Sequence, residues 1–220
     1  MAAVRPPQIP AALTEPALFE LIDGARHAGE RWADATPDLA AGEAEGVRLE
    51  GCALERVDLT GARLPGLELR DCRLTGCSLA NVLALRADLV RVELRGCRLT
   101  GLDLAEVAGG DVLLEGCRAD LSSLRFAKLT RATFRDCLLA RADLGGADLR
   151  GAAFEGCDLS GAELSGARLE RATLVNCRLD GVRGIEALRG VRMAWPDVVG
   201  LAAAFAAQLG IELLDDEDRA

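Results

Sequence analysis

Eight cysteines and a single histidine are the residues of this 220-residue sequence that could carry catalysis or bind a metal ion. A cysteine can bind zinc, form a disulfide or attack a substrate, and each role requires a suitable partner nearby. No two cysteines have the spacing of a C-x-x-C pair, and the only histidine is His27. A zinc cluster, a Ser-His-Asp triad and a Cys-His pair therefore have little support, and we expect no metal, no cofactor and no enzymatic activity.

The cysteines share a regular spacing instead. Six of them recur at every twentieth position, and Cys52 and Cys72 have the same separation. In a coiled repeat, thiols at a constant spacing point the same way off neighbouring turns, which is poor geometry for a disulfide. Because free cysteine is among the most buried residue types, we interpret all eight as reduced core side chains, and reduced thiols favour a cytoplasmic protein. The six cysteines of the longer column are Cys77, Cys97, Cys117, Cys137, Cys157 and Cys177.

All eight cysteines belong to a five-residue period that runs without a slip from residue 47 to residue 181. Steps of five from Leu49 to Leu179 give 27 central positions, of which 22 are Leu and two are Phe. The residue two places before each centre is small or apolar in every unit except that of Ser122. Two of every five side chains are therefore predicted to point inward. The aromatic centres are Phe134 and Phe154, and the centres that break the rule are Ala84, Gly109 and Ala119.

Neither regular element explains this spacing, because a helix repeats its apolar face every 3.6 residues and a strand every 2.0. A coil with flat sides of five residues does explain it, and the recurrence of the cysteines at every fourth unit gives four sides to each turn. At about 4.8 Å per turn, the units make a rod roughly 32 Å long. We therefore predict a long, thin solenoid with a ladder of Leu and Phe along its axis.

Several units have nearly the same sequence, as in ADLGG at 142–146, ADLRG at 147–151 and AELSG at 162–166. These units resemble those of the pentapeptide repeat family, whose repeat is similar to A-(D/N)-L-x-x. The resemblance covers about three fifths of the chain. It implies an all-β fold, a right-handed quadrilateral β-helix, here with about seven coils.

The period is absent from both ends, which divides the chain into residues 1–46, 47–182 and 183–220. In the first part, Met1–Leu13 is rich in Pro and Ala and is predicted to be an irregular, mobile leader. Thr14, Glu15 and Pro16 are typical of a helix start and predict a short helix over about 15–23. Residues 25–46 either cap the open first rung, or form an imperfect extra coil.

In residues 183–220, the sequence predicts a helix that begins near Trp195 and ends at Gly210, followed by a short strand at 211–214 and an acidic tail. This order resembles the C-terminal end of the quinolone-resistance pentapeptide repeat proteins. There the terminal helix caps the coil and helps to join two rods, so the resemblance implies a homodimer; capping without dimerisation is the alternative. The candidate cap and dimer residues are Val198, Leu201, Ala202, Phe205, Leu209, Ile211 and Leu213.

Apolar side chains occupy several outward positions in the middle of the array, where polar ones are expected. One explanation is a local bulge or a covered side of the coil. The other is an exposed apolar patch that binds a protein partner, because contiguous apolar surface usually marks an interaction site. The candidates for that patch are Leu83, Leu85, Leu121 and Phe126, and Leu113 is a fifth outward apolar residue.

Charge bears on the function that the family resemblance implies. The quinolone-resistance relatives are thought to imitate duplex DNA and so to bind a type II topoisomerase, either DNA gyrase or topoisomerase IV. The whole chain has a net charge of −9, but residues 47–182 contain 20 acidic and 19 basic residues and are therefore almost neutral. The net charges of the four sides of the coil are about +1, −1, 0 and −1. Such a coil has neither a phosphate-like stripe nor the basic groove that nucleic acid requires. The outward acids that a topoisomerase could contact are Asp143, Asp148 and Glu163.

The remaining classes of function find no sequence signal. The longest apolar run, at 198–209, is too short to span a membrane, and the first ten residues do not resemble a secretory signal. The sequence contains no G-x-x-x-x-G-K-[ST] phosphate-binding loop. We therefore predict a non-enzymatic cytoplasmic protein that acts through protein–protein contact, either by modulating a type II topoisomerase or by binding another partner through the apolar side.

Overall fold

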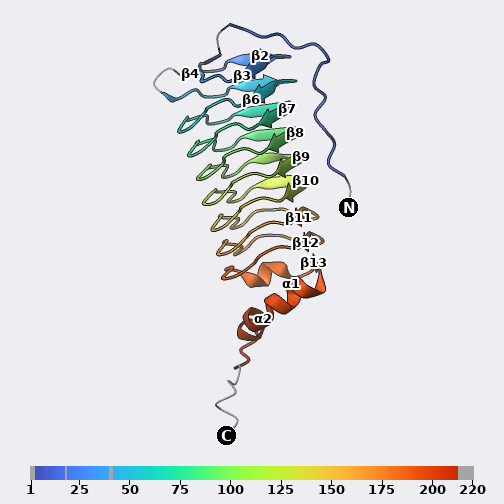
Figure 1. Cartoon of the computed structure of the whole chain (residues 1–220). Helices are drawn as coiled ribbons and strands as arrows, with labels where there is room; N and C mark the ends of the chain where they lie inside the picture. The colour runs from blue at the N-terminus through green and yellow to red at the C-terminus, as the bar shows by residue number, and fades with distance from the viewer. Residues whose placement is uncertain (1–2, 18, 40–41, 213–220) are drawn as a thin grey trace.

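The computed structural model describes residues 3–17, 19–39 and 42–212. The chain winds into a parallel β-solenoid whose coils stack along one axis, from β2 (Arg26–Ala28) at one end to β13 (Arg192–Met193) at the other (Figure 1). Leu69 pairs with Leu89 and Leu89 with Gly109, so each coil takes four pentapeptides, as the cysteine spacing predicts. The all-β solenoid fold is confirmed.

We number the coils from residue 47, so that coil 1 spans 47–66 and coil 7 spans 167–186, and sides 1–4 are the successive pentapeptides of each coil. Strands occupy sides 1 and 2, and isolated bridges such as Asp58 to Ser78 and Arg63 to Leu83 hold sides 3 and 4. The longer strands turn the corner between the first two sides. They are β7 (Glu68–Thr75), β8 (Asp88–Arg95), β9 (Ala108–Glu115) and β10 (Lys128–Arg135); the shorter ones are β5 (Arg48–Glu50), β6 (Ala53–Glu55), β11 (Ala153–Glu155) and β12 (Thr173–Val175).

The core is the predicted ladder of central side chains. Leu144 and most of the other central residues are buried, and the rings of Phe134 and Phe154 stack with centroids 4.7 Å apart. The cysteines are free thiols that line the inner wall, and the Cys97 Sγ donates to the Leu74 carbonyl oxygen at 3.4 Å. Seven are buried and Cys177 is half-buried, which confirms the register and the interpretation of the thiols as core residues.

Each corner places its residue in the left-handed region, as at Gly51 (φ 63°) and Asp71 (φ 55°). Glycine adopts this conformation without a steric penalty, whereas other residues incur one. This explains why glycine recurs at the last position of so many units.

The N-terminal part differs from the prediction at residues 15–23. No helix forms in the described residues of this segment; β1 (Glu20–Leu21) pairs instead with β4 (Asp38–Leu39). Phe19 and Leu21 are buried on one face, and the Phe19 ring stacks on Trp32 at 4.1 Å. A helix of this length is marginal alone, so burial of alternate residues as a strand prevails over the local helix signals.

Residues 25–46 contain an extra coil, which is the second of the two alternatives for this stretch. Strands β2 and β3 (Arg31–Ala33) pair with β5 and β6 of coil 1. Trp32 lies opposite Leu54, two positions further along the chain than the regular coil repeat would place its partner. The longer offset places this coil outside the five-residue period of the sequence.

The leader is also different from the prediction. Its described residues, from Ala3 onward, run back along the outside of the rod rather than extending freely (Figure 1). Arg5 forms an ion pair with Asp111 in coil 4, and the Gln8 amide donates to Asp71 in coil 2. Side chains far along the sequence therefore hold this segment, which local composition does not reveal.

At the C-terminal end, η2 (Ile185–Leu188) completes coil 7 and two helices follow β13. The predicted helix forms in two pieces, α1 (Trp195–Gly200) and α2 (Ala202–Gln208), separated at Leu201. Leu201 is buried against the last coil, which gives the segment its capping role. Ile211 and Glu212 are not in a strand; the rest of the predicted strand and the acidic tail lie outside the described residues. Within the described chain, no helix is long and apolar enough to cross a membrane.

Candidate protein-binding surfaces

The four apolar candidates lie on one side of the rod. Leu83 and Leu85 belong to side 4 of coil 2, and each is 39% exposed. Leu121 and Phe126 occupy the two corners that bound side 4 in coil 4, and they are 50% and 52% exposed. The two pairs are separated by two coils, or about 9.6 Å. We call these four residues the side-4 patch.

Backbone strain marks the lower half of the patch. Leu121 has φ 60° and Phe126 has φ 55°, a conformation that is rare for bulky residues and that glycine or a polar residue adopts at the other corners of the coil. The Phe126 ring lies against Gly146, where an added Cβ would meet a ring carbon at 2.5 Å. The Arg125 guanidinium is 5.2 Å from the ring centroid, within cation–π distance. The ring is therefore held in place while half of it faces solvent.

Two other apolar residues near the patch differ from the sequence-based expectation about exposed apolar side chains. Leu113 is buried on side 2, between Glu93 and Thr133 in the strand register, so it does not extend the patch. Leu138 on side 3 is exposed and was missed by the sequence analysis, although it also occupies an outward position. It lies outside side 4 and provides a matched exposed leucine.

The three candidate acids do not form one cluster. Asp143 and Glu163 stack on side 4, whereas Asp148 lies on side 1. The Arg125 Nη1 donates to Asp143 at 3.1 Å, and the Arg183 Nε donates to Glu163 at 2.8 Å. Each carboxylate is therefore neutralised by an arginine from the rod.

Hydrogen bonds hold these carboxylates in their charged form. The Ser165 side chain and backbone amide, together with Arg183, lower the pKa of Glu163 to about 2. The Arg150 guanidinium, with Nε 2.8 Å from the carboxylate, lowers the pKa of Asp148 below its usual value. Glu163 and Asp148 are therefore ionised near neutral pH, and each carboxylate is paired with an arginine.

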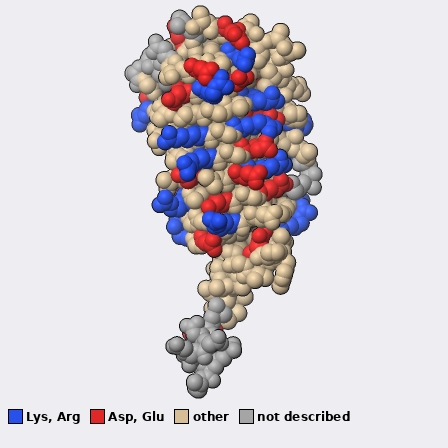
Figure 2. Space-filling model, in the orientation of Figure 1, with Lys and Arg blue, Asp and Glu red and all other residues tan. Residues whose placement is uncertain are grey.

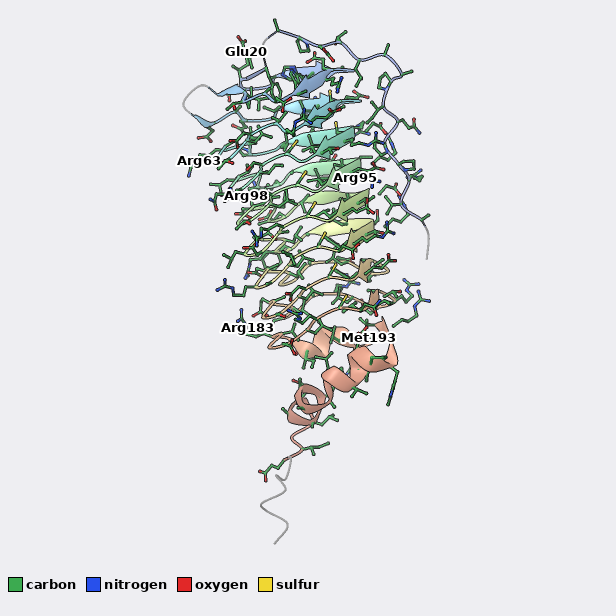
Figure 3. All side chains as sticks on the ribbon, viewed as in Figure 1. Glu20, Arg63, Arg95, Arg98, Arg183 and Met193 are labelled. Atoms are coloured by element: carbon green, nitrogen blue, oxygen red, sulfur yellow. The ribbon has the colours of Figure 1, made fainter. Side chains whose placement is uncertain are left out.

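Pairing between adjacent coils recurs over the whole rod. Partners separated by 20 residues include Arg86 with Glu106, Arg135 with Glu155 and Arg183 with Glu163. Figure 2 shows the outcome as basic and acidic side chains interleaved over the visible face. Figure 3 shows Arg63 and Arg98 projecting from the edge of the rod opposite the leader. The face in view therefore has a mixed charge pattern instead of a continuous anionic stripe.

The C-terminal candidates divide into a buried and an exposed group. Leu201 is buried and Phe205 is half-buried against the last coil, while Val198 is half-buried and Ala202 is exposed. Leu209 and Ile211 are exposed, and Leu213 lies outside the described residues. Two exposed residues of α1 were missed, although the predicted helix contains them. They are Trp195 and Val199.

No chemical centre emerges from the described residues. They contain no group of three or more His, Cys, Asp or Glu side chains that could hold a metal ion. Hydrogen bonding to the Cys117 and Cys77 thiols, together with burial, raises the pKa of Cys97, so this thiol stays protonated. His27 contacts Glu30 and the Glu20 carbonyl oxygen, each at 3.0 Å, and its ring lies edge-on to the rings of Phe19 and Trp32. These groups are accounted for by packing.

Comparison with known proteins identifies the family. A pentapeptide repeat region model matches residues 87–164, and a model of pentapeptide repeats (8 copies) matches residues 45–81 and 147–183. Together with the four-sided coil, these matches show that the chain belongs to the pentapeptide repeat family. No curated protein matches the sequence.

The chain is similar to several solved structures. HetL, a pentapeptide repeat protein involved in heterocyst differentiation regulation from the cyanobacterium Nostoc sp. strain PCC 7120, is 25% identical over 80% of this chain and 91% of its own, with a TM-score of 0.41. Full-length QnrB1, a plasmid-mediated fluoroquinolone resistance protein, is 20% identical over 90% of this chain and 100% of its own, with a TM-score of 0.35. The likeness is to the repeat fold alone.

Proposed function

We propose that this protein is a non-enzymatic binding rod that recognises a protein partner through the side-4 patch. The observation that carries this proposal is the exposure of Leu121 and Phe126, two large apolar side chains at corners of the coil. Each bears the cost of a left-handed backbone, roughly 1–2 kcal/mol, which polar residues at other corners bear as well. Unlike those polar residues, Leu121 and Phe126 also expose apolar surface to water, and exposed apolar patches usually mark interaction sites.

The surroundings of the patch define the chemistry of its partner. Arg86 and Glu106 pair at one edge of the apolar residues, and Arg125 and Asp143 pair at the other. Asp103 of coil 3 lies between Leu83 and Ser123 on the same side, so the patch combines apolar and charged side chains. Protein–protein interfaces have this mixed character. The matching surface would carry leucine or aromatic side chains about 9.6 Å apart, with charges of both signs around them. A small polar ligand or a nucleic acid would not complement such a surface.

A Phe126→Gly variant tests this proposal without endangering the fold. Glycine removes the ring and also relieves the positive φ, so the coil should remain intact. A photo-crosslinking residue at Leu85 should capture a specific protein from a lysate of the source cells, and Phe126→Gly should abolish that capture. Leu138→Ser on side 3 is the matched control and should have no effect. If the crosslinking protein captured its partner equally well alone, with Phe126→Gly and with Leu138→Ser, the patch would be excluded as the binding surface.

Modulation of a type II topoisomerase is a second candidate function. It is favoured by the C-terminal segment, whose sequence order resembles that of the quinolone-resistance relatives and whose helices expose Trp195, Val199 and Leu209. The paired acids argue against imitation of DNA. Purified DNA gyrase titrated with this protein, with and without a fluoroquinolone, tests the idea directly. Inhibited supercoiling that disappears on charge reversal of Asp143, Asp148 and Glu163 would support it, and unchanged supercoiling would remove it.

The same exposed helices support a homodimer through the C-terminal end. Trp195 and Leu209 are 76% and 75% exposed, which is unusual for large apolar side chains on a monomer. Light scattering should give twice the monomer mass, and Trp195→Ser with Leu209→Ser should return it to the monomer mass. A monomeric wild-type protein would leave the segment with its capping role only. The free thiols are consistent with action in a reducing compartment such as the cytoplasm.

A further inference from the structure

The leader follows the corner between sides 1 and 2, opposite the corner that carries Leu121. Pro10 packs over Gly51 in coil 1, where an added Cβ would lie 3.0 Å from the proline Cδ. The Gln8 amide donates to the Asp71 Oδ1 at 2.9 Å in coil 2. These contacts place residues 8–10 against coils 1 and 2, with the chain running antiparallel to the coil order.

Arg5 extends the contact to coil 4. Its backbone amide donates to the Asp111 Oδ1 at 3.1 Å, and its Nε donates to Oδ2 at 2.9 Å. The Arg5 Nη2 lies 2.7 Å from the same Oδ2, and the Asp111 side chain is only 1% exposed. A buried carboxylate thus receives both the backbone and the guanidinium of one residue.

The spacing of the leader fits the spacing of the coils. Asp71 and Asp111 are two coils apart, which corresponds to about 9.6 Å. The three residues from Arg5 to Gln8 span about 9.3 Å in a polyproline II conformation. The proline-rich sequence from Pro6 to Pro10 favours that conformation before it contacts the rod. The distance between Arg5 and the Gln8 amide in the leader therefore matches the distance between Asp111 and Asp71 on the rod.

The carboxylates are held in place independently of the leader. Arg91 donates to Asp71 through Nε and Nη2 at 2.5 and 2.6 Å. Arg131 donates to Asp111 through the same two atoms at 2.6 and 2.7 Å. Arg131 first, and Arg5 second, hold the pKa of Asp111 well below its usual range, so its charge persists at any physiological pH. The corner is therefore a preformed surface.

The leader itself is held much less firmly than the surface beneath it. The Arg5 side chain is 64% exposed, and Pro6, Gln8 and Pro10 are also exposed. The hydrogen bonds of Arg5 and Gln8 go to side-chain carboxylates instead of to a strand. Segments with few buried apolar contacts open most readily in native proteins. Because the corner is rigid and the leader is held weakly on it, another segment of similar chemistry could replace the leader.

We propose that this corner is a docking track for an extended, proline-rich segment of a partner protein that carries one arginine, and that residues 4–10 occupy the track in the free protein. The partner's guanidinium binds Asp111, an amide three residues further on binds Asp71, and a small ring packs on Gly51. This surface is distinct from the side-4 patch, and it recognises different chemistry.

A fluorescent decapeptide with the sequence of residues 3–12, AVRPPQIPAA, is the probe for this track. The full-length Arg5→Ala, Gln8→Pro variant loses both anchors of its own leader, because alanine lacks the guanidinium and proline lacks the amide hydrogen. It should bind the probe roughly tenfold or more tightly than wild type, in which the covalently attached leader competes. Fluorescence anisotropy measures the binding, and hydrogen exchange of the Arg5 and Gln8 amides in wild type reports docking of the leader.

Two further variants in the released background define the site. Asp111→Asn should reduce probe binding by roughly tenfold or more, because the charged acceptor for arginine is lost. Asp158→Asn, which breaks an ion pair with Arg178 on side 3, is the matched control and should leave binding unchanged. Failure of the released variant to bind the probe better than wild type would overturn the proposal, provided that circular dichroism shows it folded. A wild-type dimer that exchanges its leaders would also overturn it, because a second copy would then supply the occupant.

Discussion

Coil 6 (residues 147–166) and coil 4 (residues 107–126) follow the same path around the rod with different side chains. Coil 6 has a large buried residue at every centre and glycine at every corner. Its core is continuous with the stacked rings of coils 5 and 6, and its corners carry no steric strain. The four centres are Leu149, Phe154, Leu159 and Leu164, and the four corners are Gly151, Gly156, Gly161 and Gly166.

Coil 4 departs from this pattern both inside and outside. Gly109 and Ala119 replace large centres, and an apolar cavity of about 40 Å³ lies beside Ala119 in the core. Leu121 and Phe126 replace corner glycines, and Asp111 at a third corner binds the leader. Coil 6 therefore has a well-packed core and relaxed corners. Coil 4 has a poorly packed core and non-glycine residues at three corners, and these three residues belong to the two candidate binding surfaces.

The largest effect should come from truncating a centre in the regular part of the rod. Leu144→Ala should destabilise the protein by about 2–5 kcal/mol, because it leaves a cavity in a fully packed core. Leu104→Ala, at the equivalent centre of side 4 in coil 3, should cost less because Leu104 is half-buried and already lines the cavity. Urea unfolding measures both free energies. Equal losses would show that the two regions are packed equally well.

The next largest effect concerns Gly109. Its φ is 140°, and an added Cβ would lie 1.9 Å from the Leu89 carbonyl oxygen, so Gly109→Ala forces the backbone of adjacent coils apart. We expect a loss of about 2–3 kcal/mol from this overpacking. Gly151→Ala in coil 6 is the control, because nothing lies within 4 Å of the added Cβ and only the positive φ is penalised, at about 1–2 kcal/mol. Thermal unfolding that ranks Gly151→Ala as the more damaging change would contradict this account of coil 4.

The repeating part of the fold could be predicted because its period determines which side chains point inward. Leu144, Cys97 and Phe126 all have the exposure that their position in the pentapeptide implies. The ends were harder, because the pairing of Trp32 with Leu54 departs from the regular coil repeat by two positions. No local pattern encodes that change.

Contacts across the sequence account for the other differences. The leader docks through Arg5 and Asp111, which are far apart in the chain, so proline and alanine content alone predicted a mobile segment. Pairing of the candidate acids could have been anticipated, because a base four pentapeptides away from an acid lies next to it on the adjacent coil. Arg183 stands in that relation to Glu163.

A stabilising change in coil 4 would sharpen the comparison further. Ala119→Leu restores the commonest central residue and fills the cavity next to it, so it should stabilise the protein by about 0.5–2 kcal/mol. The Ala119 side chain is buried in the core and is not part of either candidate surface, and binding should therefore be unaffected. The midpoint of urea unfolding reports the gain. A loss of stability would mean that the backbone around Gly109 is too close to accept a larger neighbour.

The smallest effect is an electrostatic one in coil 6. Ser165 and Arg183 lower the pKa of Glu163 from its ordinary value of 4.5 to about 2, so the folded protein favours the charged carboxylate. This stabilisation is fully present above about pH 4.5 and is lost as the pH falls toward 2. Glu163→Gln should therefore cost less than about 1 kcal/mol at pH 7, as is usual for an exposed ion pair, and the difference from wild type should vanish near pH 2.

Ser123 occupies the same column of side 4 in coil 4 and has no charge to titrate. The difference between Ser123→Ala and wild type should therefore be independent of pH over the same range, which makes this variant the control for Glu163→Gln. Urea unfolding at intervals between pH 7 and pH 3 measures both. If the Glu163→Gln difference were as large at pH 3 as at pH 7, its origin would be packing, and the ion pairs between coils would contribute nothing that distinguishes coil 6 from coil 4.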